Sequence, residues 1–228
     1  MKIKCRLKML PSGSYIKAGP SDPIKFYRLP FIGSLYRRRI ELCLSELTGG
    51  NRILEVGFGS GVTFLNLSEK YEEIHGLDLD ADIETVSGVF EKLKIKTILR
   101  NGNVLNMPYQ DGYFDSVLLI SILEHLGPDQ QEQVFKEIAR VVKDGGQVIY
   151  GAPVYRPFMK FLFWVLGYDI GKLHLSTEKQ IFAAAEKTLK KVKMVEMRPP
   201  LLSSLYEIGH FVKYKVSGPS NDRDYAKK

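Results

Sequence analysis

The 228-residue chain has few cysteines and no long apolar run, and these shortages exclude several classes of protein. Its two cysteines, Cys5 and Cys43, lie far apart, so the sequence predicts neither a disulfide framework nor a Cys-based zinc site. No stretch reaches the roughly 18 consecutive apolar residues of a membrane-spanning helix. No apolar core of signal-peptide length follows the basic residues at the start. We therefore expect a cytoplasmic protein.

What the chain has is the composition of an ordinary globular domain with an excess of positive charge. Hydrophobic residues make up 44% and charged residues 26% of the sequence, which suits one sizeable core. The net charge of +7 leaves an anionic partner open, such as nucleic acid or a lipid surface. Charge of this size is also compatible with a role in solubility alone, and nothing in the sequence indicates an oligomeric state.

The spacing of apolar residues predicts a doubly wound α/β fold. Short apolar runs at 52–56, 74–78, 97–100, 115–120 and 147–150 indicate strands. Helical spacing is found at 34–47, 62–71, 81–93 and 130–142, and from Thr177 onward, where Gln180 completes a capping box. This alternation predicts a mostly parallel sheet with helices on both faces. Runs at 192–197 and 211–216 bring the sheet to seven strands, with an antiparallel last strand.

Composition divides the chain into three parts. Residues 1–33 are rich in Pro, Gly and Lys and are predicted to be an irregular leader. Residues 34–216 are predicted to form a single domain. Within it, residues 153–175 interrupt the strand–helix alternation and are predicted to be a lid-like insertion. The polar residues 217–228 are predicted to be a disordered tail.

The most informative stretch is a glycine-rich loop that follows the first strand and contains Gly57, Gly59 and Gly61. Glycines let a ligand approach main-chain N–H groups that no Cβ shields, and a helix that begins at the loop adds its own donors. Asp78 ends the second strand about 20 residues later, where a carboxylate can accept hydrogen bonds from two ribose hydroxyls. These features predict a nucleoside-containing cofactor at the switch point of the sheet.

Spacing and charge separate two kinds of nucleoside cofactor. In a dinucleotide fingerprint the third glycine comes one position later than Gly61 does here. Glu55, two positions before the first glycine, would lie unfavourably beside a pyrophosphate, whereas a ligand with a positive amino group would tolerate it. Both observations fit S-adenosylmethionine.

Four segments together resemble the motifs of class I S-adenosylmethionine-dependent methyltransferases of the type 11 kind. Residues 53–61 and 75–78 resemble the first two motifs, residues 102–115 the loop that holds the adenine, and residues 141–146 the segment before the fifth strand. The resemblance covers residues 51–151. It implies a Rossmann-like fold and the transfer of a methyl group from S-adenosylmethionine.

The resemblance also implies which residues hold the cofactor. The glycine loop would receive the methionine part near Glu55, Asp78 would hold the ribose, and Leu79 and Val104 would flank the adenine. The family usually has Asp at the position of Asn103, whose side-chain oxygen can still accept a hydrogen bond from the adenine amino group. The predicted cofactor set is Glu55, Gly57, Phe58, Gly59, Gly61, Asp78, Leu79, Asn103, Val104 and Ser121.

Three residues are candidates for catalysis. The string Leu123-Glu124-His125 resembles one in O-methyltransferases of quinone biosynthesis, which implies that Glu124 or His125 serves as the base. Alternatively, His125 caps local backbone and Glu124 is a solvated loop acid. His174 either contacts the acceptor or is a partly buried structural histidine. No metal site is predicted, because no second cluster of ligands accompanies Glu124.

The acceptor is the least determined part of the prediction. A small, lipophilic or aromatic molecule is favoured, because the aromatic segment 155–168 offers an apolar pocket. This segment could equally be a lid helix packed on the core or a contact with a membrane surface. Tyr15, Tyr27 and the arginines at 37–39 could close the site, and for the arginines a solvated face is favoured over a phosphate contact. An RNA or protein acceptor and a non-catalytic S-adenosylmethionine-binding protein remain as alternatives.

Overall fold

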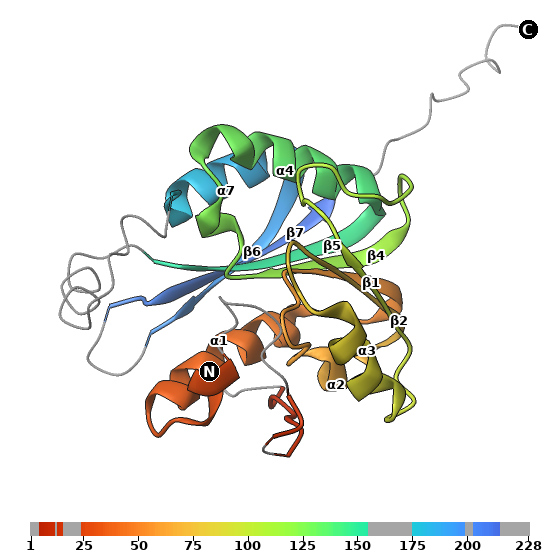
Figure 1. The fold of residues 1–228 in the computed structure, drawn as a ribbon. Helices are drawn as coiled ribbons and strands as arrows, with labels where there is room; N and C mark the ends of the chain where they lie inside the picture. The colour runs from red at the N-terminus through yellow and green to blue at the C-terminus, as the bar shows by residue number, and fades with distance from the viewer. Residues whose placement is uncertain (1–4, 12, 16–23, 155–174, 199–202, 215–228) are drawn as a thin grey trace, which may run out of the picture.

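The computed structural model describes residues 5–11, 13–15, 24–154, 175–198 and 203–214, which are coloured in Figure 1. Their centre is a seven-stranded sheet in the order β3-β2-β1-β4-β5-β7-β6. Strands β1 to β5 pair in parallel, and β7 runs antiparallel to both β5 and β6. The predicted fold class is confirmed. The strands are β1 (Gly50–Val56), β2 (Tyr71–Asp78), β3 (Thr97–Asn101), β4 (Phe114–Ile120), β5 (Val142–Pro153), β6 (Leu189–Met197) and β7 (Tyr206–Lys213).

Helices cover both faces of the sheet (Figure 1). One face carries α1 (Ile32–Glu46), α2 (Phe64–Leu67) and α3 (Ile83–Glu91), and the other carries α4 (Pro128–Val141) and α7 (Glu178–Glu186). Two short 3-10 helices, η1 (Ile24–Arg28) and η2 (Leu123–His125), precede α1 and α4. Each layer has its own apolar core, and the residues of β4 contribute to both. Val117, Leu118 and Leu119 are fully buried, as expected for a central strand between two helical layers.

The chain order reverses between β1 and β4, which are neighbours in the sheet. Strands β1, β2 and β3 extend toward one edge, and the chain then returns to place β4 on the other side of β1. The loops after β1 and β4 therefore leave in opposite directions and open a crevice at the carboxyl ends of the strands. The glycine loop and Ser121 lie at this switch point.

Local geometry explains where the sequence predictions and the observed elements differ. Helix α2 spans only Phe64–Leu67. The residues before it close the glycine loop instead: the Gly61 N–H donates to the Phe58 carbonyl (2.8 Å), and the Phe64 N–H donates to the Gly61 carbonyl (3.0 Å). Strand β7 begins at Tyr206 and not at residue 211, because Tyr206 already pairs with Pro153 of β5. The capping box of Thr177 and Gln180 is present as predicted.

The segment before α1 is more ordered than its composition suggested. Residues Ile24–Arg28 form η1, and α1 begins at Ile32. Ile24 and Tyr27 are buried against the core. The insertion segment 155–168, His174 and the tail 217–228 lie outside the described residues. In the part of the chain that is described, no helix has the length and apolarity needed to cross a membrane.

Candidate cofactor and acceptor site

The loop after β1 has a backbone conformation that requires glycine. The φ angles of Gly57, Gly59 and Gly61 are +72°, +51° and +70°, in the left-handed region that side chains disfavour. A Cβ at Gly57 would also lie 2.0 Å from Cδ1 of Ile122, and one at Gly61 would lie 2.7 Å from the rings of Phe64 and Phe90. The loop therefore presents main-chain groups at the end of β1, as the sequence predicted.

Asp78 lies where the end of β2 meets this loop. Its carboxylate accepts a hydrogen bond from the Gly59 N–H at 2.9 Å and another from the Asp80 N–H at 3.2 Å. Each carboxylate oxygen keeps a further lone pair, so both can still accept a ligand hydroxyl. Leu79, the next residue, is 73% exposed, which is high for a leucine and leaves an apolar surface beside the carboxylate. This arrangement fits a ribose on Asp78 and an adenine against Leu79.

Glu55 is a buried acid under the glycine loop. It is 3% exposed and accepts a hydrogen bond from the hydroxyl of Thr63. Burial raises the pKa of its carboxyl to about 8, against a lowering by the Thr63 bond, and the negative charge of Asp78 raises it further. The carboxyl therefore holds its proton at neutral pH, and a positive group brought to the loop would favour its ionised form.

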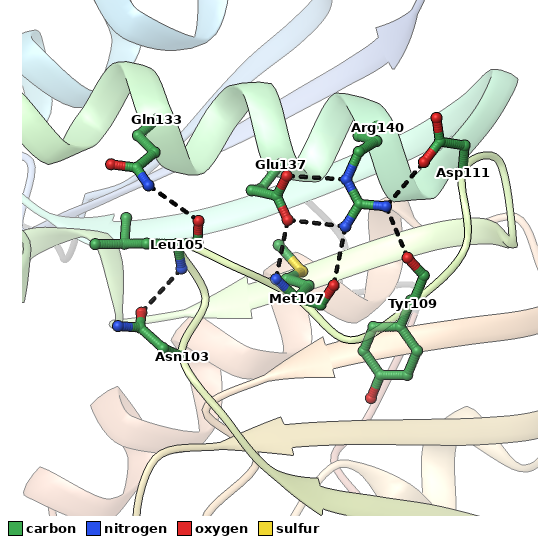
Figure 2. A network of polar contacts seen from close by, with 8 residues as sticks. All are labelled: Asn103, Leu105, Met107, Tyr109, Asp111, Gln133, Glu137 and Arg140. Carbon is green, nitrogen blue, oxygen red and sulfur yellow. Dashed lines mark hydrogen bonds and ion pairs between the residues drawn. The ribbon is translucent and has the colours of Figure 1, made fainter.

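The loop predicted to hold the adenine is fixed to α4 by a polar network (Figure 2). The guanidinium of Arg140 donates to the carbonyl oxygens of Met107 (2.9 Å) and Tyr109 (2.7 Å) and to the carboxylate of Asp111 (2.8 Å). Glu137 accepts from Arg140 and from the Met107 N–H at 2.9 Å. These bonds hold the loop residues 107–111 against the helix, and we refer to them as the Arg140 network.

The start of the same loop has its own contacts. The Asn103 side-chain oxygen accepts a hydrogen bond from the Leu105 N–H at 2.9 Å, and Gln133 of α4 donates to the Leu105 carbonyl at 3.1 Å. The oxygen that was predicted to accept from adenine is thus already engaged in a local turn, although a second lone pair remains. Val104 is 8% exposed and packs in the core on the α4 side, so it reaches the predicted adenine position only by its edge.

Ser121 joins three elements at the end of β4. Its φ angle is +57°, an uncommon value for a residue with a side chain, and its N–H donates to the Gly151 carbonyl at 2.8 Å. Its hydroxyl shares a hydrogen bond of 2.8 Å with the Tyr206 hydroxyl and accepts one of 3.0 Å from Arg39. The unusual backbone conformation thus turns the side chain toward β7 and α1.

Glu124 and His125 have different environments. Glu124 is 2% exposed, and its Oε2 atom is buried without a hydrogen-bond partner. Burial raises the pKa of this carboxyl, against a lowering by the charges of His125 and Arg39 and a hydrogen bond from Ser121. The hypothesis that Glu124 is a solvated loop acid is therefore wrong. His125 is exposed, so of the two residues only Glu124 is sequestered from water.

Arg39 was predicted to lie on a solvated face, and this prediction is wrong. Its guanidinium lies 4.2 Å from the ring centroid of Tyr36 and donates to the Tyr27 hydroxyl at 3.2 Å as well as to Ser121. The physical reason is that α1 packs across β4, β5 and β7, which brings this side of the helix to the ends of the strands. Arg39 and Tyr27, which the sequence suggested as residues that could close the site, are thus linked to Ser121, and Tyr206 is a further residue of this cluster that the sequence did not reveal.

One predicted site residue, Phe58, does not point into the crevice in the way expected, and another, His174, is not among the described residues. The ring of Phe58 is 4% exposed and packs on Phe64, so only its backbone faces the loop. His174 falls outside the described residues, but Leu175 and Ser176 after it donate their N–H groups to the Glu124 carbonyl at 2.7 Å and 3.2 Å. The chain that leaves the insertion thus meets the segment carrying Glu124.

A surface cavity lies away from this site, and the described residues contain no metal-binding cluster. A surface cavity of about 630 Å³ lies at the amino ends of the strands, lined by residues such as Lys70, Tyr71 and Lys96, and none of the site residues borders it. Among the described residues, no group of three or more His, Cys, Asp or Glu side chains could hold a metal ion.

Residues 54–150 of the chain match the family model of a methyltransferase domain. An ajmaline N-methyltransferase from Rauvolfia serpentina is 33% identical over 124 residues, which are 50% of this chain and 42% of that protein. A ubiquinone biosynthesis O-methyltransferase from Alkalilimnicola ehrlichii is 32% identical over 129 residues, 56% of this chain and 51% of that protein. The chain thus spans about half the length of the curated relatives it matches.

The fold has a close counterpart among solved structures. The N-methyltransferase NodS from Bradyrhizobium japonicum, solved in complex with S-adenosylhomocysteine, superposes with a TM-score of 0.63 at 14% identity, over 87% of this chain and 95% of NodS. The family match begins at the residue before Glu55 and includes the glycine loop, Asp78 and Glu124. Over residues 54–150 the chain is therefore similar to methyltransferase domains, and it shares the fold of NodS.

Proposed function

We propose that the chain is an enzyme that transfers a methyl group from S-adenosylmethionine to a small-molecule acceptor, with Glu124 as the general base. The observation that carries the cofactor assignment is the bond between the Gly59 N–H and the Asp78 carboxylate at the switch point. It brings the two predicted cofactor elements to one place. The relatives that support a small acceptor carry the names of an alkaloid N-methyltransferase and a ubiquinone biosynthesis O-methyltransferase.

The residues of the crevice fit this cofactor in three respects. The glycine loop leaves room for a ligand to approach the backbone, and the Asp78 carboxylate has lone pairs for two ribose hydroxyls. The exposed side chain of Leu79 offers an apolar face for the adenine. Glu55 lies under the loop, where a ligand ammonium group would favour its ionised form. When bound, S-adenosylmethionine supplies an electrophilic methyl group on a sulfonium.

The chemistry left to the protein is alignment and the removal of one proton. Glu124 is suited to the second task, because it is buried beside the end of β4 and its raised pKa makes it a stronger base than an exposed carboxylate. Its buried, unpartnered Oε2 atom is free to accept that proton. Ser121 and the residues bonded to it define the neighbouring wall of the acceptor pocket.

The first experiment identifies the class of acceptor. Purified protein is incubated with methyl-labelled S-adenosylmethionine and with separate RNA, protein, lipid and small-molecule fractions of a cell extract. We expect label only in the small-molecule or lipid fraction. Label in RNA or protein would replace the proposed acceptor class with a macromolecule, and the absence of label from every fraction would favour a protein that binds the cofactor without turnover.

The second experiment tests the role of Glu124. We expect Glu124→Gln to lower kcat by about 100-fold or more, because base catalysis contributes roughly 10²–10⁴-fold, with little change in the affinity for S-adenosylhomocysteine. Glu132→Gln, which changes an exposed acid on α4, is the matched control and should keep the wild-type rate. A wild-type rate in Glu124→Gln would remove this residue from the mechanism.

A further inference from the structure

Two residues of opposite charge at the end of β4, Glu124 and Arg39, each have a buried polar atom without a hydrogen-bond partner. The Oε2 atom of Glu124 and the Nε atom of Arg39 are both shielded from solvent, and neither has a partner among the described residues. The charge of Arg39 nevertheless acts on the Glu124 carboxyl. A buried polar atom without a partner costs about 1–3 kcal/mol, so such a pair calls for a ligand group or a water molecule.

The groups around Arg39 leave only part of its guanidinium available. Its Nη1 atom donates to the Ser121 hydroxyl at 3.0 Å and its Nη2 atom donates to the Tyr27 hydroxyl at 3.2 Å. Tyr36 covers one face of the guanidinium, with its ring centroid 4.2 Å away. The three contacts fix the orientation of the guanidinium, and Nε is its nitrogen atom without a hydrogen-bond partner.

The available atoms define what a ligand must present. Glu124 offers a carboxylate oxygen that accepts a hydrogen bond, and Arg39 offers an N–H that donates one. A hydroxyl group suits both residues, because its proton can be donated to the carboxylate and its oxygen can accept a hydrogen bond from a guanidinium. A neutral amine can donate to Glu124, but the positive charge that it gains on methylation is repelled by Arg39.

On the basis of the proposed function, we infer that the acceptor is an acidic hydroxyl compound, a phenol or an enol, and that Arg39 is the residue that selects oxygen as the methylated atom. The guanidinium stabilises the oxyanion that forms when the proton leaves. Tyr27, Tyr36 and Tyr206, which lie within 6.0 Å of the Arg39 guanidinium by ring centroid, form an aromatic wall suited to a planar acceptor.

The transfer is balanced without a further reactant. The acceptor oxygen forms the new O–C bond, and its proton passes to the Glu124 carboxylate. The bond between the methyl carbon and sulfur breaks, and its electron pair stays on sulfur. The positive charge of the sulfonium and the negative charge of the carboxylate are both lost, so the site ends with a neutral ether and a protonated Glu124. Solvent takes this proton when the products leave.

The position of the transferred methyl group is the direct test. S-adenosylmethionine with a ¹³C-labelled methyl group is incubated with the small-molecule fraction, and the product is examined by NMR, where methyl groups on oxygen, nitrogen and carbon have separate ¹³C shifts. We expect a methyl group on oxygen. A methyl group on nitrogen or carbon overturns this inference and leaves the proposed function standing, whereas the absence of any labelled product overturns the proposed function.

A binding experiment tests the role of Arg39 without turnover. The probe is 4-nitrophenol, whose phenolate absorbs visible light, added to protein saturated with S-adenosylhomocysteine, and 4-nitroaniline is the amine of matching shape. We expect the wild-type protein to bind 4-nitrophenol at least tenfold more tightly than 4-nitroaniline and to lower the pKa of the bound phenol. Equal binding of the two probes, or binding of neither, overturns the inference.

Variants then assign the preference to one side chain. Arg39→Met should abolish the preference for 4-nitrophenol and the change in its pKa, and Arg39→Lys should keep part of both, since it retains the charge. Arg198→Met removes the same charge from an exposed position and should behave as wild type. Unchanged affinity for S-adenosylhomocysteine shows that each variant is folded. A preference for 4-nitrophenol that survives in Arg39→Met overturns the assignment to Arg39. If Arg39→Met does not fold, the assignment is overturned when Arg39→Lys shows the same preference and the same pKa of the bound phenol as wild type.

Discussion

The buried carboxyl of Glu55 should make the stability of the cofactor-free protein depend on pH in a defined way. Burial first, and then the nearby charge of Asp78, raise the pKa of this carboxyl from 4.5 to about 8 in the folded chain, against a lowering by Thr63. The interval between these two values corresponds to roughly 5 kcal/mol of cost for the ionised form, at about 1.4 kcal/mol for each tenfold change. Only 3% of the residue is exposed, so solvent screens little of that cost.

The sign of the effect follows from proton binding. Between pH 4.5 and 8 the folded chain keeps a proton on Glu55 that the unfolded chain has lost, so the free energy of unfolding falls as pH rises. The contribution is complete below pH 4.5 and is lost as pH rises through about 8. Glu55→Gln keeps the shape of the side chain and removes its titration. We expect this variant to gain about 1.4 kcal/mol relative to wild type for each pH unit between about 5 and 8.

Urea denaturation of both proteins at a series of pH values measures this difference. Glu91→Gln, which alters an exposed acid on α3, is the control and should give a curve parallel to wild type. Saturating S-adenosylmethionine should narrow the gap between Glu55→Gln and wild type, because its ammonium group favours the ionised Glu55. Parallel curves for Glu55→Gln and wild type without cofactor would show that this carboxyl is not held neutral, and the reasoning would fail.

Three further predictions concern the cofactor site. Asp78→Ala should weaken S-adenosylmethionine binding at least tenfold, or roughly 1.4 kcal/mol for a lost charge-assisted bond, and unchanged affinity in calorimetry would contradict this. Gly61→Ala should lower the free energy of unfolding by about 2–4 kcal/mol, because the residue has a positive φ and the added Cβ would meet two aromatic rings. Gly88→Ala is the control: this glycine lies in open space on α3, and the variant should raise the free energy of unfolding by about 0.5–1 kcal/mol. Equal effects of the two variants in urea denaturation would refute the argument. Arg140→Ala should weaken S-adenosylhomocysteine binding several-fold while kcat at saturation stays near wild type, and an unchanged KM would show that the Arg140 network does not position the adenine loop.

The parts of the fold that could be predicted from sequence are those decided by local patterns. The parallel strands are continuous apolar runs, the glycine loop needs three residues without a Cβ, and the α7 start carries a capping box of Thr177 and Gln180. Each of these signals is complete within about ten residues of chain. The length of α2 and the start of β7 were not predicted, because they depend on loop closure and on pairing with β5.

The cofactor end of the site was predicted in more detail than the acceptor end for the same reason. Gly59 follows β1 and Asp78 ends β2, the next strand in the sequence, and the Gly59 N–H donates to the Asp78 carboxylate at 2.9 Å. Arg39, Ser121 and Tyr206 come from three distant parts of the sequence and meet only because α1 crosses the sheet beside β7. No local pattern distinguishes Arg39 from the two arginines before it, so its role becomes visible only in three dimensions.

The backbone around residues 155–174 has a consequence for how acceptor preference can change. On one side, the Val154 N–H is bonded to the Leu205 carbonyl at 3.1 Å, and on the other, the Leu175 N–H is bonded to the Glu124 carbonyl at 2.7 Å. One anchor lies beside the ends of β5 and β7 and the other at η2, and both are made by main-chain atoms, which do not depend on side-chain identity. If the proposed function holds, a different segment joined at these two bonds should change the acceptor and leave the glycine loop and Asp78 in place.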